Sequence, residues 1–338
     1  MFESFVPQHL TDSLWLRLAN TRLFITGGTG LFGHWFLDSL TEANQRLNLK
    51  IEATVLTRNP NLAITKMPNL DKRISFLKGD VGNFLFTSEK FDYILHMATT
   101  SANETFQGFS QTNKVQMLFE GTKRVIELAH NSGAKRILFT SSGAVYGNQS
   151  YDYIEESSAM HIDPLKAESG LAIGKCGAEF LLSQACVETD LEAVIARCFA
   201  FVGPGMPMNL HYAIGNFIFN AAEGKPIIIK GDGTAIRSYM YMGDLIWWLL
   251  KLLLDGKSGE AYNVGSDQPI TIKSLAQTIA NLCNSKSEII VQGQSDYSVG
   301  LPVRNLYIPS IKKAQENFQL KINTDINNAI IYTYNTLL

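Results

Sequence analysis

The chain has 338 residues, of which 46% are hydrophobic and 18% charged, and its formal net charge is −2. This composition excludes a disordered chain and predicts a sizeable core, at a length that fits two domains of roughly 100–200 residues. No dense stripe of lysine and arginine is present, so we expect neither nucleic acid nor a membrane surface as a principal partner.

Cysteine usage and the apolar segments predict a cytoplasmic protein. The four cysteines lack metal-ligand spacing, so we expect no metal site and no disulfide. The first residues, MFESFVPQHLTDSLWLRLAN, lack the basic start of a signal peptide. The run LIWWLLKLLL at 245–254 is far shorter than the ~18–20 residues that span a bilayer, which favours a buried helix.

In the first half of the chain, short apolar runs alternate with helical patterns. This alternation predicts an α/β fold of the Rossmann type, a doubly wound parallel sheet. Helices are expected from about Leu31, over 116–134 and over 167–182. Strands are expected at 22–26, 51–57, 74–80, 92–98 and 136–142.

The second half is less regular. Residues 191–204 continue the sheet, and 224–244 hold two short strands with glycine turns. Helices are expected at 243–254 and 271–283. The domains predicted are an N-terminal extension (1–20), a cofactor-binding Rossmann domain (21–200) and a mainly substrate-binding, smaller mixed α/β domain (201–338). Crossovers of the chain between the last two are allowed, and a ligand cleft is expected between them.

The stretch TGGTGLFG (26–33) is the first functional motif. It contains Gly-x-x-Gly-x-x-Gly, follows a predicted strand and opens a predicted helix. Glycines permit a tight turn that brings the backbone close to a pyrophosphate, and the helix N-terminus supplies N–H donors. A dinucleotide site is therefore predicted. Its expected contacts are Gly27, Gly30, Leu31, Phe32 and Gly33.

The end of the second predicted strand bears on the choice of cofactor. A site for NAD usually offers an acid to the adenosine ribose at this place. Here the sequence has Thr57 and Arg58. A guanidinium can pair with a 2′-phosphate, which favours NADP over NAD and leaves both open.

Several further motifs follow in order: GD at 79–80, HMA at 96–98, SSGAVYG at 141–147 and a lysine, Lys175, on the next predicted helix. With the glycine loop, they resemble the extended short-chain dehydrogenase/reductase family. RCFAFVGPG (197–205), GDGTAIRSYMYMGDL (231–245) and GEAYNVGS (259–266) resemble its nucleotide-sugar epimerase/dehydratase branch. The resemblance covers about residues 20–310.

The resemblance implies contacts to NAD or NADP. It maps the acid of the third strand, which contacts adenine, to Asp80, with Val81 beside it. It maps the cofactor-lining segment after the fourth strand to Ala98 and Thr99. Lys175 takes the place of the lysine that holds the nicotinamide ribose and lowers the pKa of the catalytic tyrosine.

The resemblance also implies substrate contacts. Ser142 takes the place of the catalytic serine that binds the reacting hydroxyl. Arg237 matches an arginine that grips the diphosphate of a nucleotide sugar. Arg304 is a second candidate for this role, because charge-assisted bidentate pairs suit a diphosphate.

Three departures separate the chain from the family pattern. The position of the family tyrosine, the general acid/base, is Leu171, and no tyrosine lies between Tyr153 and Tyr212. The Asp–Glu pair typical of sugar 4,6-dehydratases is replaced by Gly143 and Ala144, which disfavours an ordinary 4,6-dehydratase. A substrate-contacting asparagine is replaced by Ala200.

Four residues are candidates to replace the missing tyrosine as the acid/base. Glu168 lies nearly one turn before Leu171, and a buried carboxylate could have a raised pKa and act as a base. The preceding segment holds Tyr151, Tyr153 and His161. Each of these four is interpreted first as a structural or exposed residue, and the acid/base stays unassigned.

Three functions are weighed on these grounds. The favoured hypothesis is an NAD(P)-dependent epimerase/dehydratase-type enzyme on a nucleotide-diphosphate sugar, with an atypical acid/base. The alternatives are a catalytically silent NAD(P)-binding sensor, favoured by Leu171 and Ala200, and a reductase of a non-nucleotide carbonyl compound, disfavoured by the Arg237 segment. The resemblance further implies a homodimer formed through two helices of each subunit, one of them the Lys175 helix.

Overall fold

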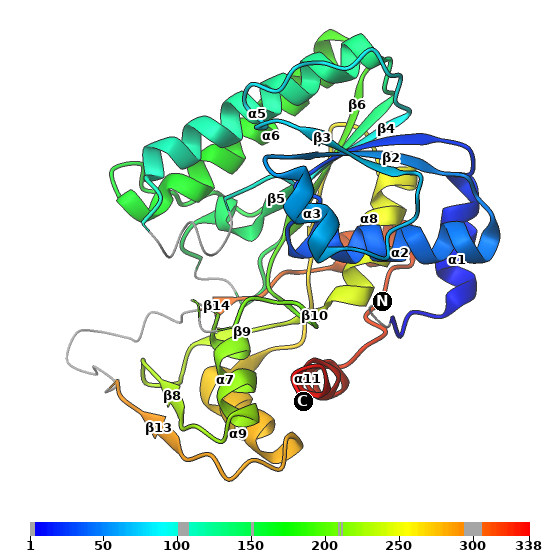
Figure 1. The fold of residues 1–338 in the computed structure, drawn as a ribbon. Helices are drawn as coiled ribbons and strands as arrows, with labels where there is room; N and C mark the ends of the chain where they lie inside the picture. The colour runs from blue at the N-terminus through cyan, green and yellow to red at the C-terminus, as the bar shows by residue number, and fades with distance from the viewer. Residues whose placement is uncertain (1–3, 101–107, 150–151, 209, 211, 294–305) are drawn as a thin grey trace.

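The computed structural model describes residues 4–100, 108–149, 152–208, 210, 212–293 and 306–338. Its centre is a seven-stranded sheet in the order β11-β6-β5-β4-β1-β2-β3, and every neighbouring pair is parallel (Figure 1). The predicted fold class is thereby confirmed. The strands are β1 (Arg22–Thr26), β2 (Glu52–Thr57), β3 (Ile74–Lys78), β4 (Tyr93–His96), β5 (Arg136–Ser142), β6 (Glu192–Cys198) and β11 (Ala261–Val264).

Helices cover both faces of this sheet (Figure 1). On one face α2 and α8 lie against each other, with α1 packed on both; on the other, α5 lies along α6. The short α3 contacts β3. The bounds are α1 (Gln8–Arg17), α2 (Leu31–Leu47), α3 (Pro60–Lys66), α5 (Gln111–Ser132), α6 (Gly170–Glu188) and α8 (Met242–Asp255), with 3₁₀ turns η1 (Gly143–Tyr146) and η2 (Ala167–Ser169).

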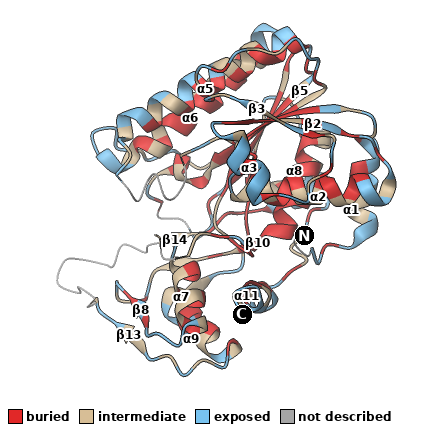
Figure 2. Ribbon diagram, in the orientation of Figure 1, coloured by how far each residue is buried: buried red, intermediate tan, exposed pale blue. Residues whose placement is uncertain are grey.

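The strands of the sheet form the centre of the hydrophobic core (Figure 2). Ile137, Leu138 and Phe139 of β5 are fully buried, as expected for a parallel sheet whose two faces are both covered by helices. The predicted N-terminal extension joins this core, because Trp15 of α1 is 1% exposed and its ring centroid lies 5.5 Å from that of Phe36 on α2.

Small residues explain how α6 lies so close to α5. A Cβ at Gly170 would lie 2.6 Å from Gln111, and one at Gly174 would lie 2.7 Å from Leu118. A Cβ at Gly177 would lie 3.0 Å from Phe119. The glycines of α6 therefore all face α5, and the cation on the same helix, Lys175, belongs to the sheet side.

The remaining elements form a smaller, mixed region below the sheet in Figure 1. It holds a parallel pair β13-β8, a three-stranded sheet β12-β9-β14 and a pair β10-β7. The elements are β7 (Phe201–Val202), α7 (Ala213–Ala222), β8 (Ile227–Ile229), β9 (Ile236–Arg237), β10 (Met240–Tyr241), β12 (Ile270–Thr271), α9 (Ile272–Leu282), β13 (Ile289–Val291), β14 (Leu306–Tyr307) and α11 (Ile326–Asn335). The short α10 (Lys312–Phe318) packs instead on β11 of the large sheet.

The expected strands and helices are present, and several bounds differ. The strands expected at 74–80 and 92–98 end two residues early, because their last residues turn into loops. The run expected at 191–204 divides into β6 and β7. The chain also returns from the smaller region to the large sheet, where α8 covers one face and β11 forms the edge beside β6.

Candidate functional site

The glycine loop between β1 and α2 has the close contacts that glycine alone allows. Gly27 has φ +71°, and a Cβ there would lie 2.5 Å from the backbone of Met97 at the end of β4. A Cβ at Gly33 would lie 2.3 Å from the Cα of Gly28, so strand and helix meet closely. Gly30 precedes α2, and no described side chain caps this helix or places an acid in its first turn. This backbone cradle fits the pyrophosphate of a dinucleotide.

The two apolar residues of the loop anchor the start of α2. Leu31 and Phe32 are half-buried and pack against the main hydrophobic core. The Phe32 ring meets the ring of Phe201 on β7 edge-on, with centroids 5.0 Å apart. Their packing therefore fixes where the helix N-terminus points.

The candidates for the adenosine end lie on neighbouring strands β2 and β3. Arg58 directly follows β2 and is exposed; the Thr57 hydroxyl before it accepts a hydrogen bond from the Asn59 N–H at 3.3 Å. Asp80 follows β3, is exposed, and accepts from the Gly82 N–H at 3.1 Å. Both strands end at the same edge of the sheet, so Arg58 and Asp80 reach the same region.

Val81 has a different environment from its neighbour Asp80. Its side chain is 8% exposed, and a Cβ at Gly121 of α5 would lie 3.0 Å from it. Val81 therefore packs its side chain into the interface with α5.

A chain of side-chain hydrogen bonds fixes the segment after β4. The Ala98 N–H donates to Thr26 Oγ1 at 3.1 Å, and Thr26 Oγ1 lies 2.7 Å from His96 Nδ1. Thr122 Oγ1 donates to the Leu118 carbonyl at 2.7 Å, so it accepts from His96 Nε2 at 3.1 Å. His96 is therefore the neutral tautomer with its proton on Nε2.

Burial lowers the pKa of His96 to about 3, and the charge of Lys175 acts in the same direction. The imidazole stays neutral at physiological pH and serves as a structural link. Thr99, one residue beyond the hydrogen-bonded Ala98, is exposed at the edge of the sheet.

Lys175 of α6 is buried against the ends of the central strands. It is 3% exposed; its Nζ donates to the Thr140 carbonyl at 2.6 Å and lies 4.5 Å from the centroid of the Phe139 ring. Burial lowers its pKa to about 8, against the opposing influence of Cys198 and Glu179. A lysine ammonium has three N–H donors, so it can donate hydrogen bonds to the hydroxyl groups of a bound ligand as well.

Ser142 is the last residue of β5, at the same edge of the sheet. Its Oγ accepts from the Ala144 N–H at 3.1 Å and so begins the turn η1. The hydroxyl of Tyr307 lies beside this turn, because a Cβ at Gly143 would lie 2.5 Å from it. Ser142 lies two residues beyond Thr140, the acceptor for Lys175, so the structure brings the two predicted catalytic residues together.

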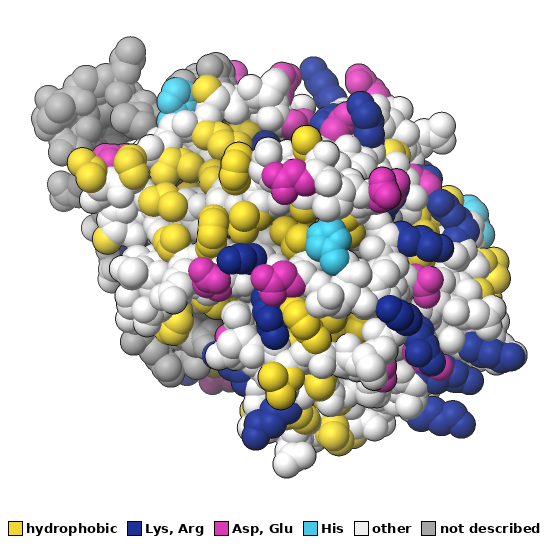
Figure 3. Space-filling view, turned by 90° about the horizontal axis from the view of Figure 1, so that it is seen from above, with side chains coloured by type: hydrophobic (Ala, Val, Ile, Leu, Met, Phe, Trp, Pro, Cys, Tyr) yellow, Lys and Arg dark blue, Asp and Glu magenta, His cyan; other side chains and the backbone are white. Residues whose placement is uncertain are grey.

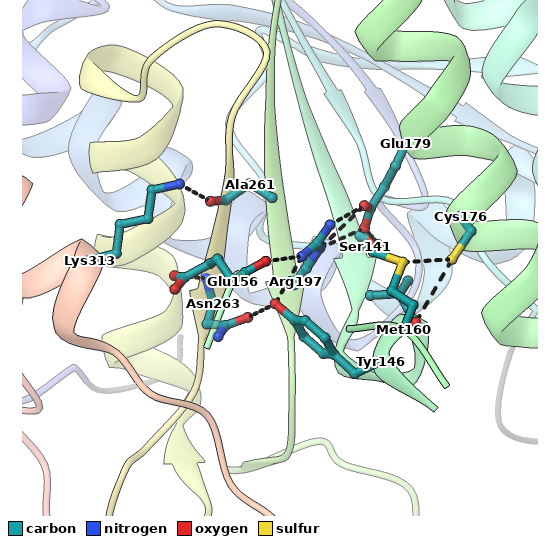
Figure 4. A network of polar contacts seen from close by, with 11 residues as sticks. Ser141, Tyr146, Glu156, Met160, Cys176, Glu179, Arg197, Ala261, Asn263 and Lys313 are labelled. Carbon is teal, nitrogen blue, oxygen red and sulfur yellow. Dashed lines mark hydrogen bonds and ion pairs between the residues drawn. The ribbon is translucent and has the colours of Figure 1, made fainter. Parts of the chain in front are cut away.

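A buried polar network holds α6 on the sheet (Figure 4). Arg197 of β6 pairs with Glu179 of α6 at 2.8 Å, and each residue is 7% exposed. Ser141 donates to Glu179, and Arg197 donates to the hydroxyl of Tyr146 at 2.9 Å. That hydroxyl donates in turn to Asn263 of β11 at 2.7 Å. The network thereby links the helix of Lys175 to three strands.

The residues considered as replacements for the missing tyrosine lie on the surface. Leu171 is half-buried, while Glu168, Tyr153 and His161 are exposed. Tyr151 lies outside the described residues. None of the described three is buried.

The predicted diphosphate contacts have different outcomes. Arg237 lies on β9, is half-buried, and its Nη1 donates to the Ile236 carbonyl at 2.8 Å. Arg304 falls outside the part of the chain that the structure describes. The residue opposite Arg237 on the neighbouring strand β14 is Tyr307.

Tyr307 is the residue of this site that the sequence did not single out. Its ring centroid lies 4.7 Å from that of Phe199, and its hydroxyl lies beside Ser142 and Gly143. The only local signal was its place three residues after Arg304 in PVRNLYIP.

The structure was expected to hold no metal site and no membrane-spanning helix. Among the described residues, no group of three or more His, Cys, Asp or Glu side chains could hold a metal ion. Within the same part of the chain, no helix is both long enough and apolar enough to cross a membrane. Residues 245–254 lie in the buried helix α8, as predicted.

The chain is similar to one protein family and to several known enzymes. The family model described as "NAD dependent epimerase/dehydratase family" matches residues 23–265. UDP-glucuronic acid decarboxylase 5 of Arabidopsis thaliana is 30% identical over 288 residues, which cover 84% of this chain and 80% of the relative. The dTDP-D-glucose 4,6-dehydratase of Homo sapiens is 26% identical over 302 residues, which cover 85% of this chain and 81% of the relative.

Solved structures share the fold over nearly the whole chain. An epimerase of Methanothermobacter thermautotrophicus matches with a TM-score of 0.80 at 22% identity, covering 97% of this chain and 95% of that one. UDP-glucose 4-epimerase of Thermotoga maritima matches with a TM-score of 0.77 at 19% identity, covering 94% and 98%.

Proposed function

The chain belongs to the NAD-dependent epimerase/dehydratase family and is an enzyme, and we propose that its substrate is a nucleotide-diphosphate sugar. The observation that supports this most directly is a continuous arrangement of side chains. Lys175 binds the backbone of β5, Ser142 ends that strand, and Tyr307 joins Ser142 to the strand that carries Arg237. Relatives named for UDP-glucuronic acid and dTDP-glucose support the same substrate class.

We infer that the cofactor is NAD or NADP, held by Gly27, Gly30 and Gly33 through their backbone and by the adjoining helix N-terminus. The exposed Arg58 and the lack of an acid at the end of β2 favour NADP. When bound, the nicotinamide supplies reversible hydride acceptance. Asp80, Val81, Ala98 and Thr99 are proposed to line the adenine and the rest of the cofactor.

The chain's own residues would then act on the sugar and the cofactor. Ser142 binds and polarises the reacting hydroxyl, and Lys175 orients the nicotinamide ribose. Arg237, with Arg304 as its proposed counterpart, neutralises the diphosphate. Because a tightly held cofactor can be reduced and reoxidised in one cycle, the reaction expected is an epimerisation or elimination without net redox change.

We propose that the enzyme is a cytoplasmic homodimer that pairs through α5 and α6. Large apolar side chains are exposed on these helices: Phe119 is 39%, Phe180 61% and Val187 78% exposed. Figure 3 looks onto this side of the molecule, where hydrophobic side chains gather. Burying such a patch against a second copy would be favourable.

A binding screen tests the proposal. The purified protein is denatured and any released dinucleotide is identified by mass; the intact protein is then titrated with UDP-, dTDP-, GDP- and CDP-sugars in thermal unfolding assays. We expect NADP or NAD and a rise in the unfolding temperature with at least one nucleotide sugar. A dinucleotide without any response to nucleotide sugars would contradict the substrate class and favour a reductase of another carbonyl compound.

A matched pair of arginine variants sharpens the screen. Arg237→Met should remove the response to the nucleotide sugar. Arg22→Met is the control, because Arg22 begins β1 at the opposite edge of the sheet and pairs with Glu52 at 2.8 Å on the surface. An unchanged response in Arg237→Met would remove Arg237 from the proposed site.

A further inference from the structure

Leu171 cannot exchange a proton, so the proposed reaction needs a proton-transferring group elsewhere in the site. Tyr146, the tyrosine of the AVYG motif, already uses its hydroxyl in hydrogen bonds to other side chains. Its hydroxyl accepts from Arg197 at 2.9 Å, donates to Asn263 at 2.7 Å, and is fully buried. It belongs to the network under the site and has no hydrogen bond to spare for a substrate.

Tyr307 brings a second phenol to the site from the smaller region. Its hydroxyl lies beside the turn that begins at Ser142, the residue proposed to hold the reacting hydroxyl. Its ring packs against Phe199 with centroids 4.7 Å apart. A Cβ at Gly143 would lie 2.5 Å from the Tyr307 hydroxyl, so the phenol fills the space that a side chain at 143 would need.

The segment that carries this phenol is firmly held. Ile154 donates its N–H to the Ile308 carbonyl at 2.9 Å, and Ser310 donates to the Ile154 carbonyl at 2.8 Å. Asn263 Nδ2 donates to the carbonyls of Ile154 and Ser310, at 2.8 and 3.2 Å. These bonds position Tyr307 from both the sheet and the loop, as a preorganised group requires.

Burial is the largest influence on the Tyr307 phenol and raises its pKa overall. Ser142 and the positive charge of Arg237 act in the opposite direction. Cys198, at the end of β6, interacts electrostatically with both Lys175 and Tyr307. Arg237 is the cation on the neighbouring strand that would stabilise a phenolate.

We propose that Tyr307 is the catalytic acid/base of this enzyme in place of the tyrosine missing at position 171, an inference that rests on the proposed function. In the oxidising half-reaction, Tyr307 Oη first loses its own proton to solvent, and the resulting phenolate takes the proton of the sugar hydroxyl held by Ser142. The C–H bond of the same carbon breaks, and its hydrogen leaves with both electrons to the oxidised nicotinamide, so the alcohol becomes a ketone. In the return half-reaction the phenol gives the proton back to the sugar oxygen.

Tyr307→Phe tests this role, because it removes only the hydroxyl and keeps the ring on Phe199. We expect kcat for the converted nucleotide sugar to fall by about 10²- to 10⁴-fold, with KM and the unfolding temperature nearly unchanged. The matched control is Tyr239→Phe. Tyr239 is half-buried and interacts electrostatically with Arg237, but its ring packs against the main hydrophobic core, and its variant should keep the wild-type kcat.

A second readout needs neither cofactor nor turnover. Tyrosinate absorbance is titrated in the cofactor-free protein, and the difference between wild type and Tyr307→Phe isolates one phenol. We expect this phenol to ionise above the ordinary tyrosine pKa and to ionise at still higher pH in Ser142→Ala, which removes a group that lowers its pKa. An ionisation that does not depend on Ser142 would contradict the placement of the phenol beside Ser142 and so overturn the proposed role.

The outcomes separate this inference from the proposed function. If wild type converts a nucleotide sugar and Tyr307→Phe keeps a near-normal kcat, the acid/base role of Tyr307 is overturned while the proposed function stands. A rise in KM at constant kcat would overturn the same role, because it would indicate that Tyr307 binds the substrate. A loss of kcat in Tyr239→Phe instead would also overturn it. If wild type binds and converts no nucleotide sugar, the proposed function fails and the acid/base role fails with it.

Discussion

The hydroxyl of Tyr307 lies 2.5 Å from the position that a Cβ on Gly143 would take. Ring atoms of Phe199 lie 2.9 Å from the same point. A phenol beside Ser142 and a side chain at residue 143 therefore exclude one another. This explains in physical terms why the site has a glycine where 4,6-dehydratases typically carry an acid.

Gly143→Ala should disturb the chemistry more than the fold. The new methyl group displaces the phenol from Ser142, and a misplacement of about 1 Å can cost about 10²-fold in rate. We expect a fall of that size in kcat, with a loss of stability of about 1–3 kcal/mol from overpacking. Steady-state kinetics and urea unfolding measure both.

The control for this substitution is Gly231→Ala, because a Cβ at Gly231 meets no atom within 4 Å. It should leave both kcat and stability near wild type. Equal kcat values in the two variants would contradict the exclusion between Gly143 and Tyr307.

Glu179→Gln should destabilise the protein strongly. It leaves the guanidinium of Arg197 buried without its counter-ion, and breaking a buried pair costs about 3–5 kcal/mol. The comparison is Glu127→Gln, which removes a partly exposed pair with Arg124 at 3.2 Å and should cost less than about 1 kcal/mol. Denaturant unfolding of the two variants measures the difference; similar losses would show that the buried network does not hold α6 in place.

Lys175→Met should change how stability depends on pH. The pKa of Lys175 falls from 10.5 to about 8 on folding, so between these values the unfolded chain binds more protons than the folded one. The stability of wild type relative to Lys175→Met should therefore rise between pH 7 and 10, by about 2–3 kcal/mol. Unfolding of the cofactor-free proteins at several pH values tests this, and a constant difference would mean that Lys175 is not buried as a cation at neutral pH.

His96 should stay neutral well below pH 6.5. Because its folded pKa is about 3, its contribution to stability is complete above pH 6.5 and is lost as the pH falls toward 3. Histidine ¹⁵N NMR at pH 5 should show a neutral ring protonated on Nε2, assigned by its absence in His96→Gln. A positively charged His96 at pH 5 would contradict the hydrogen-bond chain from Thr26 to Thr122.

The parts of the fold and site that the sequence predicts are those set by local patterns. Gly30 and Gly33 are required by close contacts to Gly27 and Gly28 of the same loop, and the alternation of strand and helix is likewise local. Lys175 could be placed because its helix has a regular period and its neighbours resemble a family motif.

The parts that could not be predicted depend on pairings between distant segments. Tyr307 reaches Ser142 because β14 pairs with β9 and because Ile154 binds the backbone of Ile308 and Ser310. No spacing along the chain encodes these contacts. For the same reason the predicted domain boundaries allow crossovers of the chain but do not say that the returning segment is β11.

The most direct measurement is ¹H NMR of nucleotide sugars incubated with the cofactor-loaded protein, using UDP-glucose, UDP-glucuronic acid and dTDP-glucose in turn. We predict that at least one sugar is converted to a new nucleotide-linked sugar while the total amounts of oxidised and reduced cofactor stay constant. Unchanged spectra for a wider panel of nucleotide sugars, from protein that binds both the dinucleotide and a nucleotide sugar, would contradict the account and favour a silent binding protein.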